Sequence, residues 1–206
     1  MKKLTMIAVT AAVVLAGGLS FKVGQVSAAT AMPAVGQTAP GFTLPSQTGA
    51  KISLSSFKGK WVVLYFYPKD MTTGCTIEAH NFQAAQAQFT AKNAVILGVS
   101  VDSAASHQQF CTKENLTFRL LSDTKQTVVN AYGSLGSNGM ASRNTFLINP
   151  QGKIAQEWAG VSPATTVSTV LAAIPGGAAP AMLAPSQRTL EMSVKPPPPT
   201  GSTSPQ

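Results

Sequence analysis

The sequence predicts an α/β sandwich in which a central mixed sheet is flanked by helices. Three apolar runs, at residues 61–67, 94–101 and 144–148, are rich in β-branched and aromatic residues, which is typical of strands covered on both faces. Segments with helical spacing lie between these runs, and this alternation favours helices packed on a sheet. A turn at 149–153 precedes a further strand over 154–158, so a hairpin adds an antiparallel pair and makes the sheet mixed.

The elements around the first long strand follow from local pattern. A small amphipathic hairpin is expected before it, with strands over 42–44 and 52–54 and a turn around 47–49. A helix is expected after it, over residues 73–92. Apolar residues at helical spacing indicate the buried face of this helix, namely Phe82, Ala85 and Phe89.

Three more helices are expected further along the chain. The first covers residues 103–115, and residues three and four apart on it share one face. That face carries His107, Phe110 and Cys111. The second covers 122–132, with a serine cap at its start and Gly133 after its end. The third begins at Ser162-Pro163. Its inward face carries Val167, Val170, Leu171 and Ile174.

Residues 1–29 are expected to form a signal peptide or a membrane anchor. Lys2 and Lys3 make a basic start, residues 4–21 are apolar apart from small Thr, Ser and Gly residues, and small residues at 27–31 offer a cleavage site. An uncleaved anchor is the alternative, because about 18 apolar residues can just span a bilayer. In either case we expect the working domain to be exported, in the periplasm or outside the cell, or tethered to the membrane and facing outside.

Residues 176–206 are predicted to be a Pro-rich disordered tail. The four prolines at 196–199 exclude a helix or a paired strand there. The segment cannot bury enough apolar surface to offset its loss of entropy on ordering. A proline-rich docking segment is the alternative. Residues 30–175 remain as one domain with one core.

The charge of the chain does not indicate a nucleic-acid partner. The net charge is +8, and without Lys2, Lys3 and Lys22 it is +5. The basic residues are scattered, with no Lys/Arg block and no interleaved aromatic residues. We therefore attribute the charge to solubility.

Cys75 lies in the first turn of the helix expected after the first long strand. That turn offers unpaired backbone N–H groups and the positive end of the helix dipole, and both favour the nucleophilic thiolate over the thiol. Pro68 can hold the turn and keep water from the sulfur, and Thr72 can direct a hydroxyl into the same pocket. The alternative is a buried structural cysteine, which is the usual environment of a free cysteine.

The stretch from Pro68 to Cys75 carries a family resemblance. Its residues PKDMTTGC match the P-x-x-x-T-x-x-C motif of peroxiredoxins, and the surrounding sequence resembles the Q-type branch, the bacterioferritin comigratory proteins. Similar segments follow at 106–110 and 120–123, and Arg143 stands where the family has its active-site arginine. The resemblance covers about residues 34–174.

The resemblance implies a thioredoxin-like fold and a thiol peroxidase without a cofactor. Cys75 would be the peroxidatic cysteine, whose thiolate attacks a hydroperoxide and becomes a sulfenic acid. Thr72 and the backbone N–H groups near Gly74 and Cys75 would bind the peroxide oxygens. Arg143 would stabilise the thiolate and polarise the substrate, because its planar fork of donors is always charged. Its alternative role is a surface charge at the start of a strand.

The sequence departs from the family at His80. Many Q-type members have a resolving cysteine five residues after the peroxidatic one, and here that residue is a histidine. A histidine cannot form the disulfide, and five residues is not a same-face spacing on a helix. We interpret His80 as a partly exposed helix residue; an acid–base helper is the alternative.

Cys111, the only other cysteine, takes over the resolving role in the implied mechanism. It follows Cys75 by 36 positions on the second expected helix, an arrangement that some Q-type members resemble. A disulfide needs Cα atoms within about 7 Å, so we expect local unwinding around both cysteines. Two alternatives stay open. In the first, Cys111 is only a core cysteine and a thiol from another molecule resolves Cys75. In the second, Cys75 and Cys111 form a purely structural disulfide.

Other function classes have less support. Two cysteines and two histidines at 75, 80, 107 and 111 match no zinc spacing, so no metal site is expected. The chain has no C-x-x-C, which disfavours a thioredoxin-type disulfide reductase. A binding or holdase module on the same scaffold and a disulfide-exchange enzyme remain as competing hypotheses. The expected partners are a hydroperoxide and a thioredoxin-like reductant, and a monomer is expected from the resemblance.

Overall fold

The computed structural model describes residues 31–176, which contain seven strands, four α-helices and one 3-10 helix. In chain order these are β1 (Thr43–Pro45), β2 (Lys51–Ser53), η1 (Leu54–Phe57), β3 (Trp61–Phe66), α1 (Thr73–Ala91), β4 (Ala94–Ser100), α2 (Ala104–Glu114), β5 (Arg119–Ser122), α3 (Thr127–Ala131), β6 (Thr145–Ile148), β7 (Ile154–Trp158) and α4 (Thr166–Ala173).

Five strands form one sheet in the order β5-β4-β3-β6-β7. The strand β3 pairs in parallel with β4 and antiparallel with β6, so the predicted mixed sheet is confirmed. β6 and β7 form the expected antiparallel hairpin. β1 and β2 form the small separate hairpin, with Leu44 opposite Ile52.

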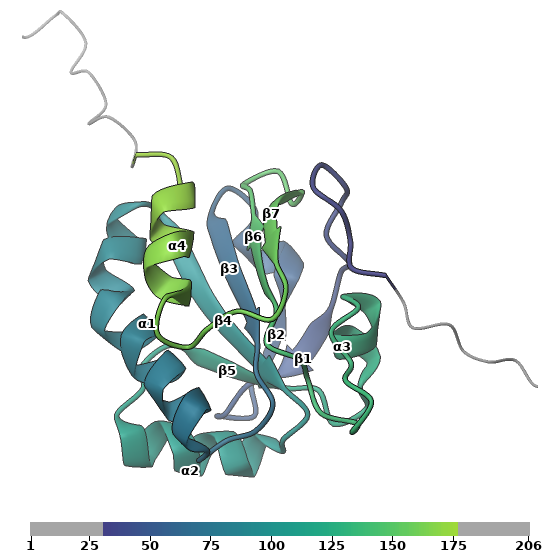
Figure 1. Ribbon diagram of the computed structural model, residues 1–206, viewed down its shortest axis with the longest axis vertical. Coiled ribbons are helices and arrows are strands. Elements are labelled where there is room, and N and C mark those ends of the chain that lie inside the picture. The colour runs from purple at the N-terminus through teal and green to yellow at the C-terminus, as the bar shows by residue number, and fades with distance from the viewer. Residues whose placement is uncertain (1–30, 177–206) are drawn as a thin grey trace, which may run out of the picture.

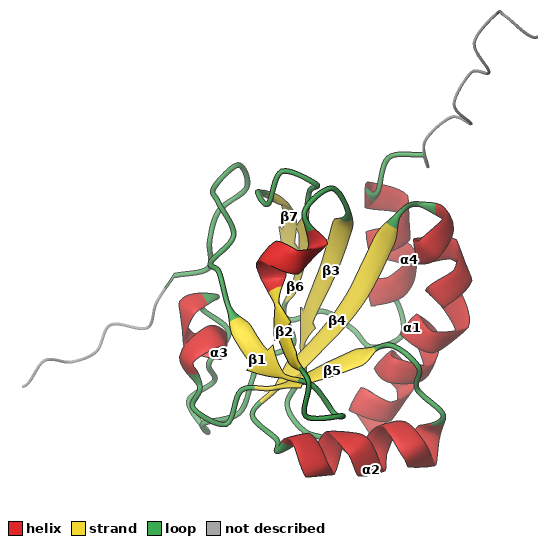
Figure 2. Cartoon of the chain, turned by 180° about the vertical axis from the view of Figure 1, so that it is seen from behind, coloured by secondary structure: helices red, strands yellow, loops and turns green. Residues whose placement is uncertain are grey.

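The sheet has a hydrophobic core on each face. In Figure 1, α1 and α4 lie side by side over one face, and α3 lies on the other side. Figure 2, seen from behind, shows the β1–β2 hairpin and α3 on that second side. The first core contains both cysteines together with residues of α1, α2 and α4, among them Phe82, Phe110 and Val170. The second contains residues of β1 and α3, among them Leu44 and Val129.

The helices at 73–92 and 103–115 are confirmed within one residue at each end. α2 is capped by Ser103, whose hydroxyl accepts from the backbone N–H of Ser106, and it ends at Asn115 in the left-handed conformation. Its buried residues are the predicted His107, Phe110 and Cys111.

The helix predicted over residues 122–132 was wrong at its start. An edge strand that was not predicted, β5, covers Arg119–Ser122, and the helix covers only Thr127–Ala131. Ser122 ends the strand, and the following Asp123 caps the helix through its carboxylate. α4 also starts later than expected, at Thr166, after a turn closed by hydrogen bonds to the Ser162 carbonyl.

The predictions for the two ends of the chain lie outside the described residues. These are the signal peptide or anchor over 1–29 and, apart from Gly176, the tail over 176–206. Within residues 31–176, none of the helices has the length and apolar character needed to cross a membrane.

Candidate active site

The loop between β3 and α1 presents Cys75. β3 ends at Phe66 and α1 begins at Thr73, so Cys75 lies in the first helical turn, with only 2% of its surface exposed. Met71 has a φ of 60°, an uncommon value for a residue with a side chain, and it turns the chain into the helix. The first-turn N–H groups have no partner within the helix itself and are available to an anion.

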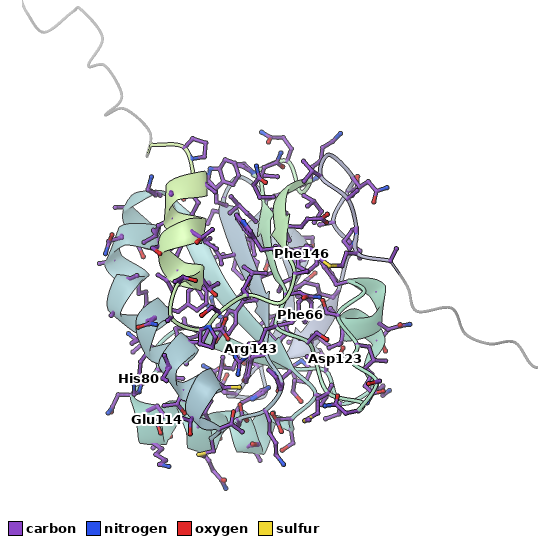
Figure 3. The ribbon with its side chains drawn as sticks, in the orientation of Figure 1. Phe66, His80, Glu114, Asp123, Arg143 and Phe146 are labelled. Carbon is purple, nitrogen blue, oxygen red and sulfur yellow. The ribbon has the colours of Figure 1, made fainter. Side chains whose placement is uncertain are left out.

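Arg143 lies directly against the sulfur of Cys75. Its Nη2 is 3.1 Å from Sγ. The strand register explains this contact, because Tyr65 of β3 faces Thr145 of β6, and the residues that precede β6 therefore run beside the loop after β3. Figure 3 shows Arg143 beside the start of α1. The structure thus brings together two predicted site residues that are 68 positions apart.

Gly74 makes room for the guanidinium group. A Cβ atom at this position would lie 2.9 Å from Nη2 of Arg143, which is closer than real Cβ contacts allow. Any larger residue at position 74 therefore displaces the guanidinium from Cys75. Gly74 matters at this point for space and not for backbone conformation.

Glu78 holds the other side of the guanidinium. Its Oε2 accepts from Nη1 of Arg143 at 2.6 Å, and its side chain is fully buried. Burial raises the pKa of Glu78 to about 7, although the charge and hydrogen bond of Arg143 act in the opposite direction. Sequence reasoning assigned no role to Glu78. The available signal was a glutamate on the apolar face of α1, four residues before Phe82.

Two other predicted site residues lie between β3 and Cys75. Thr72 is exposed at the N-cap of α1, and its hydroxyl donates to the carbonyl of Lys69 at 3.0 Å. Because its proton is used there, the oxygen has lone pairs free to accept from a hydroperoxide. Pro68 is half-buried between β3 and the loop. Both residues therefore stand next to the Cys75 turn, and their roles in binding remain predictions.

Cys111 lies on α2 as a free, buried thiol, and Cys75 is free as well. Burial, followed by the negative charge of Asp70, raises the pKa of Cys111 to about 11. The thiol is therefore protonated at neutral pH and a poor nucleophile in this conformation. Both cysteines belong to the same hydrophobic core but occupy different helices.

His80 points away from the reactive sulfur. Its side chain is 51% exposed, as predicted, and its Nε2 is 2.9 Å from Oε2 of Glu114. Figure 3 shows the two residues next to each other on the outside of the molecule, where α1 and α2 meet. His80 therefore links the two cysteine-bearing helices.

Residues 31–176 contain no group of three or more His, Cys, Asp or Glu side chains arranged to hold a metal ion. His80 pairs with Glu114 at the surface, whereas His107 is buried and pairs with Asp70. The two histidines thus have separate partners.

Known proteins resemble the chain across this domain. Residues 35–157 match the AhpC/TSA family. A putative peroxiredoxin bcp of Coxiella burnetii is 46% identical over 131 residues, which cover 60% of this chain and 87% of that protein. Peroxiredoxin Bcp of Bacillus subtilis is 41% identical over 144 residues, which cover 66% of this chain and 92% of that protein.

Solved structures agree with this relationship. A bacterioferritin comigratory protein of Xanthomonas campestris, described with its alkyl peroxide reduction activity, has a TM-score of 0.62 and 36% identity, and the match covers 65% of this chain and 89% of that one. Peroxidoxin BcpB of Mycobacterium tuberculosis has a TM-score of 0.65 and 32% identity, with coverages of 69% and 96%. The predicted thioredoxin-like sandwich is therefore confirmed, and the chain belongs to the AhpC/TSA family as a peroxiredoxin, a thiol peroxidase.

Proposed function

We propose that Cys75 is the peroxidatic residue of this enzyme. Its thiolate attacks the terminal oxygen of a hydroperoxide, the O–O bond breaks, and the leaving oxygen takes a proton to become water or an alcohol. Sulfur loses two electrons and becomes a sulfenic acid. The 3.1 Å contact between Arg143 and Sγ carries this proposal, because it places a fixed positive charge where the thiolate and the polarised peroxide need one.

The surrounding groups fit a peroxide between Arg143 and the helix start. The N–H groups of the first turn of α1 can donate to the oxygens, and the Thr72 hydroxyl can accept the peroxide proton. Glu78 fixes the orientation of the guanidinium through the Nη1 hydrogen bond, which leaves Nη2 to face the sulfur. Two exposed apolar residues, Met71 and Ile77, lie within four residues of Cys75 in the chain, which suits organic hydroperoxides as well as hydrogen peroxide.

We propose that Cys111 resolves the sulfenic acid. Its thiol attacks the Cys75 sulfur, a disulfide forms, and water leaves. Two solved mutants of the Xanthomonas protein carry serine in place of cysteines 36 positions apart in that chain, the same separation as Cys75 and Cys111. A dithiol protein of the thioredoxin type then reduces this disulfide, and its own two thiols are oxidised to a disulfide.

Rapid-mixing kinetics with hydrogen peroxide test the first step. Cys75→Ser should abolish peroxide consumption, and Arg143→Ala should slow it by about a hundredfold, the loss typical of a missing charge-stabilising donor. Arg119→Ala, on the exposed start of β5, is the matched control and should react at the wild-type rate. Full activity in Cys75→Ser would overturn the assignment.

Mass spectrometry after one equivalent of peroxide tests the second step. The wild-type protein should lose the mass of two hydrogen atoms relative to its reduced form and show no free thiol. A lasting sulfenic acid beside a free Cys111 would contradict the resolving role and favour an external thiol.

We also propose that the domain over 30–175 works outside the cytoplasm as a monomer. The basic and apolar pattern of residues 1–29 supports export, and an uncleaved segment would tether the enzyme to the membrane. Fractionation of the native host with N-terminal sequencing tests this proposal. A cytoplasmic protein that retains Met1 would contradict it.

A further inference from the structure

A buried carboxylate in the loop before Cys75 joins this loop to the helix of Cys111. Asp70 is 4% exposed. Its Oδ1 accepts from the hydroxyl of Tyr67 at 2.7 Å. Its Oδ2 accepts from the hydroxyl of Ser106 at 2.7 Å and lies 2.8 Å from Nδ1 of His107. Ser106 and His107 are both on α2, and we call their two hydrogen bonds to Asp70 the Asp70–α2 contact.

The Asp70–α2 contact is strong because it is buried and charged. Burial alone would raise the pKa of Asp70, but the hydrogen bond and charge of His107, followed by the hydroxyl groups, outweigh burial and lower the pKa. The carboxylate is therefore ionised and can only accept hydrogen bonds. Nδ1 of His107 must then be protonated, and it donates to Oδ2 of Asp70. His107 is fully buried, and its Nε2 has no hydrogen-bond partner within residues 31–176. Asp70 is the nearer of two polar partners of Nδ1, because the hydroxyl of Tyr67 lies 3.3 Å from the same nitrogen.

The position of this contact relates it to both thiols. Asp70 precedes Cys75 by five residues, and His107 precedes Cys111 by four residues on the same buried face of α2. Cys75 faces Arg143, and Cys111 is packed in the core. Cys75 and Cys111 are free thiols on different helices, so joining them through a movement of the Cys75 loop shifts this loop against α2. That shift breaks the Asp70–α2 contact.

We propose that Asp70 and His107 are positioning residues that hold the Cys75 loop on α2 and thereby set how the Cys75 sulfenic acid reacts next. This inference rests on the proposed function. While the contact holds, the sulfenic acid stays beside Arg143, and a second hydroperoxide converts it to a sulfinic acid and releases an alcohol or water. Once the contact opens, the Cys111 thiol attacks instead, a disulfide forms and water leaves. A weaker contact therefore favours the disulfide.

Substitutions on α2 test how the sulfenic acid divides between the sulfinic acid and the disulfide. His107→Leu removes the donor, whereas His107→Asn places an amide N–H close to the position of Nδ1 and should restore the bond. Intact-protein mass spectrometry over a peroxide titration gives the concentration at which half of the protein becomes sulfinic. We expect this concentration to rise about tenfold in His107→Leu, the effect of losing one hydrogen bond to a charged group, and to stay near wild type in His107→Asn. Ser106→Ala should raise this peroxide concentration by a smaller factor. It replaces His107→Leu in the experiment if that variant does not fold.

A second measurement needs no peroxide. Iodoacetamide labelling of Cys111 in the reduced protein should be about tenfold faster in His107→Leu and in Asp70→Asn. The two variants change the charge near Cys111 differently, so a shared increase reports opening of α2. Val129→Ala, in the core on the other face of the sheet, is the control for general loss of stability and should label at the wild-type rate.

The outcomes separate the two proposals. A wild-type protein that forms no disulfide with peroxide would contradict the proposed function. Wild-type behaviour of His107→Leu and Ser106→Ala in both measurements, or an equal increase in Val129→Ala, would overturn the positioning role while leaving the peroxidase intact.

Discussion

At the scale of single residues, the site depends on one guanidinium held between a sulfur and a buried carboxylate. Arg143 contacts Cys75 with Nη2 and Glu78 with Nη1, and Gly74 leaves the space for this arrangement. Removing one partner of a buried ion pair leaves the other charge uncompensated, which makes such a pair costly to break. Glu78 is therefore expected to influence both the reaction and the stability of the fold.

Glu78 should make stability depend on pH in the neutral range. Its pKa is raised from 4.5 to about 7 in the folded protein, so the folded state retains a proton that the unfolded state has lost. This contribution is fully present below pH 4.5, falls as the pH rises, and levels off above pH 7. Urea unfolding of wild type and Glu78→Gln should show a difference in unfolding free energy that shrinks by about 3 kcal/mol across this range.

The glutamine variant is the reference for this experiment because it keeps the size of the side chain and cannot titrate. Titratable groups that do not interact with Glu78 contribute equally to both proteins. A difference that stays constant between pH 4.5 and 8 would show that Glu78 is already ionised at acid pH, contrary to its raised pKa.

At the scale of secondary structure elements, α3 depends on a capping residue. The carboxylate of Asp123 accepts from the backbone N–H groups of Thr127, Val128 and Val129 at 3.1, 2.8 and 2.7 Å. α3 has only five residues, and helices this short are not stable on their own. The cap therefore supplies much of what fixes the helix on the sheet.

Asp123→Ala should lower the unfolding free energy by about 3 kcal/mol, because it leaves buried N–H groups without an acceptor. Asp123→Asn keeps one acceptor oxygen and should lose less. Urea denaturation of both variants measures the difference. If the alanine and asparagine proteins are equally stable, the hydrogen bonds of the carboxylate are not what fixes α3.

The same elements show what can be predicted from sequence and what cannot. Long buried strands and the two helices that carry the cysteines follow from local pattern, and the resemblance to peroxiredoxins indicated Cys75 and Arg143 together. β5 has only four residues, and its pairing with β4 defines it as a strand, so no local pattern reveals it. The pairing of Asp70 with His107 across 37 positions likewise depends on how α2 packs beside the loop after β3.

At the scale of the whole molecule, the sheet separates a core that contains both cysteines from a core that contains neither. Cys75 and Cys111 belong to the core on one face, whereas α3 and β1 pack on the other. The segment before α4 lies close to the site, because the Asn81 side chain of α1 donates to the Pro163 carbonyl and the backbone N–H of Val161 donates to the Arg143 carbonyl. The two cores should therefore differ in their effect on the reaction.

Two matched substitutions test this difference. Val170 of α4 and Val129 of α3 are both fully buried helical valines, one in each core. Each change to alanine should lower the unfolding free energy by about 2 kcal/mol through lost burial and a small cavity. Val170→Ala should also slow the reaction of Cys75 with peroxide, because α4 supports the segments that position α1 and Arg143, while Val129→Ala should leave that rate unchanged. Equal rates in the two variants at equal loss of stability would mean that the packing of α4 does not position Arg143.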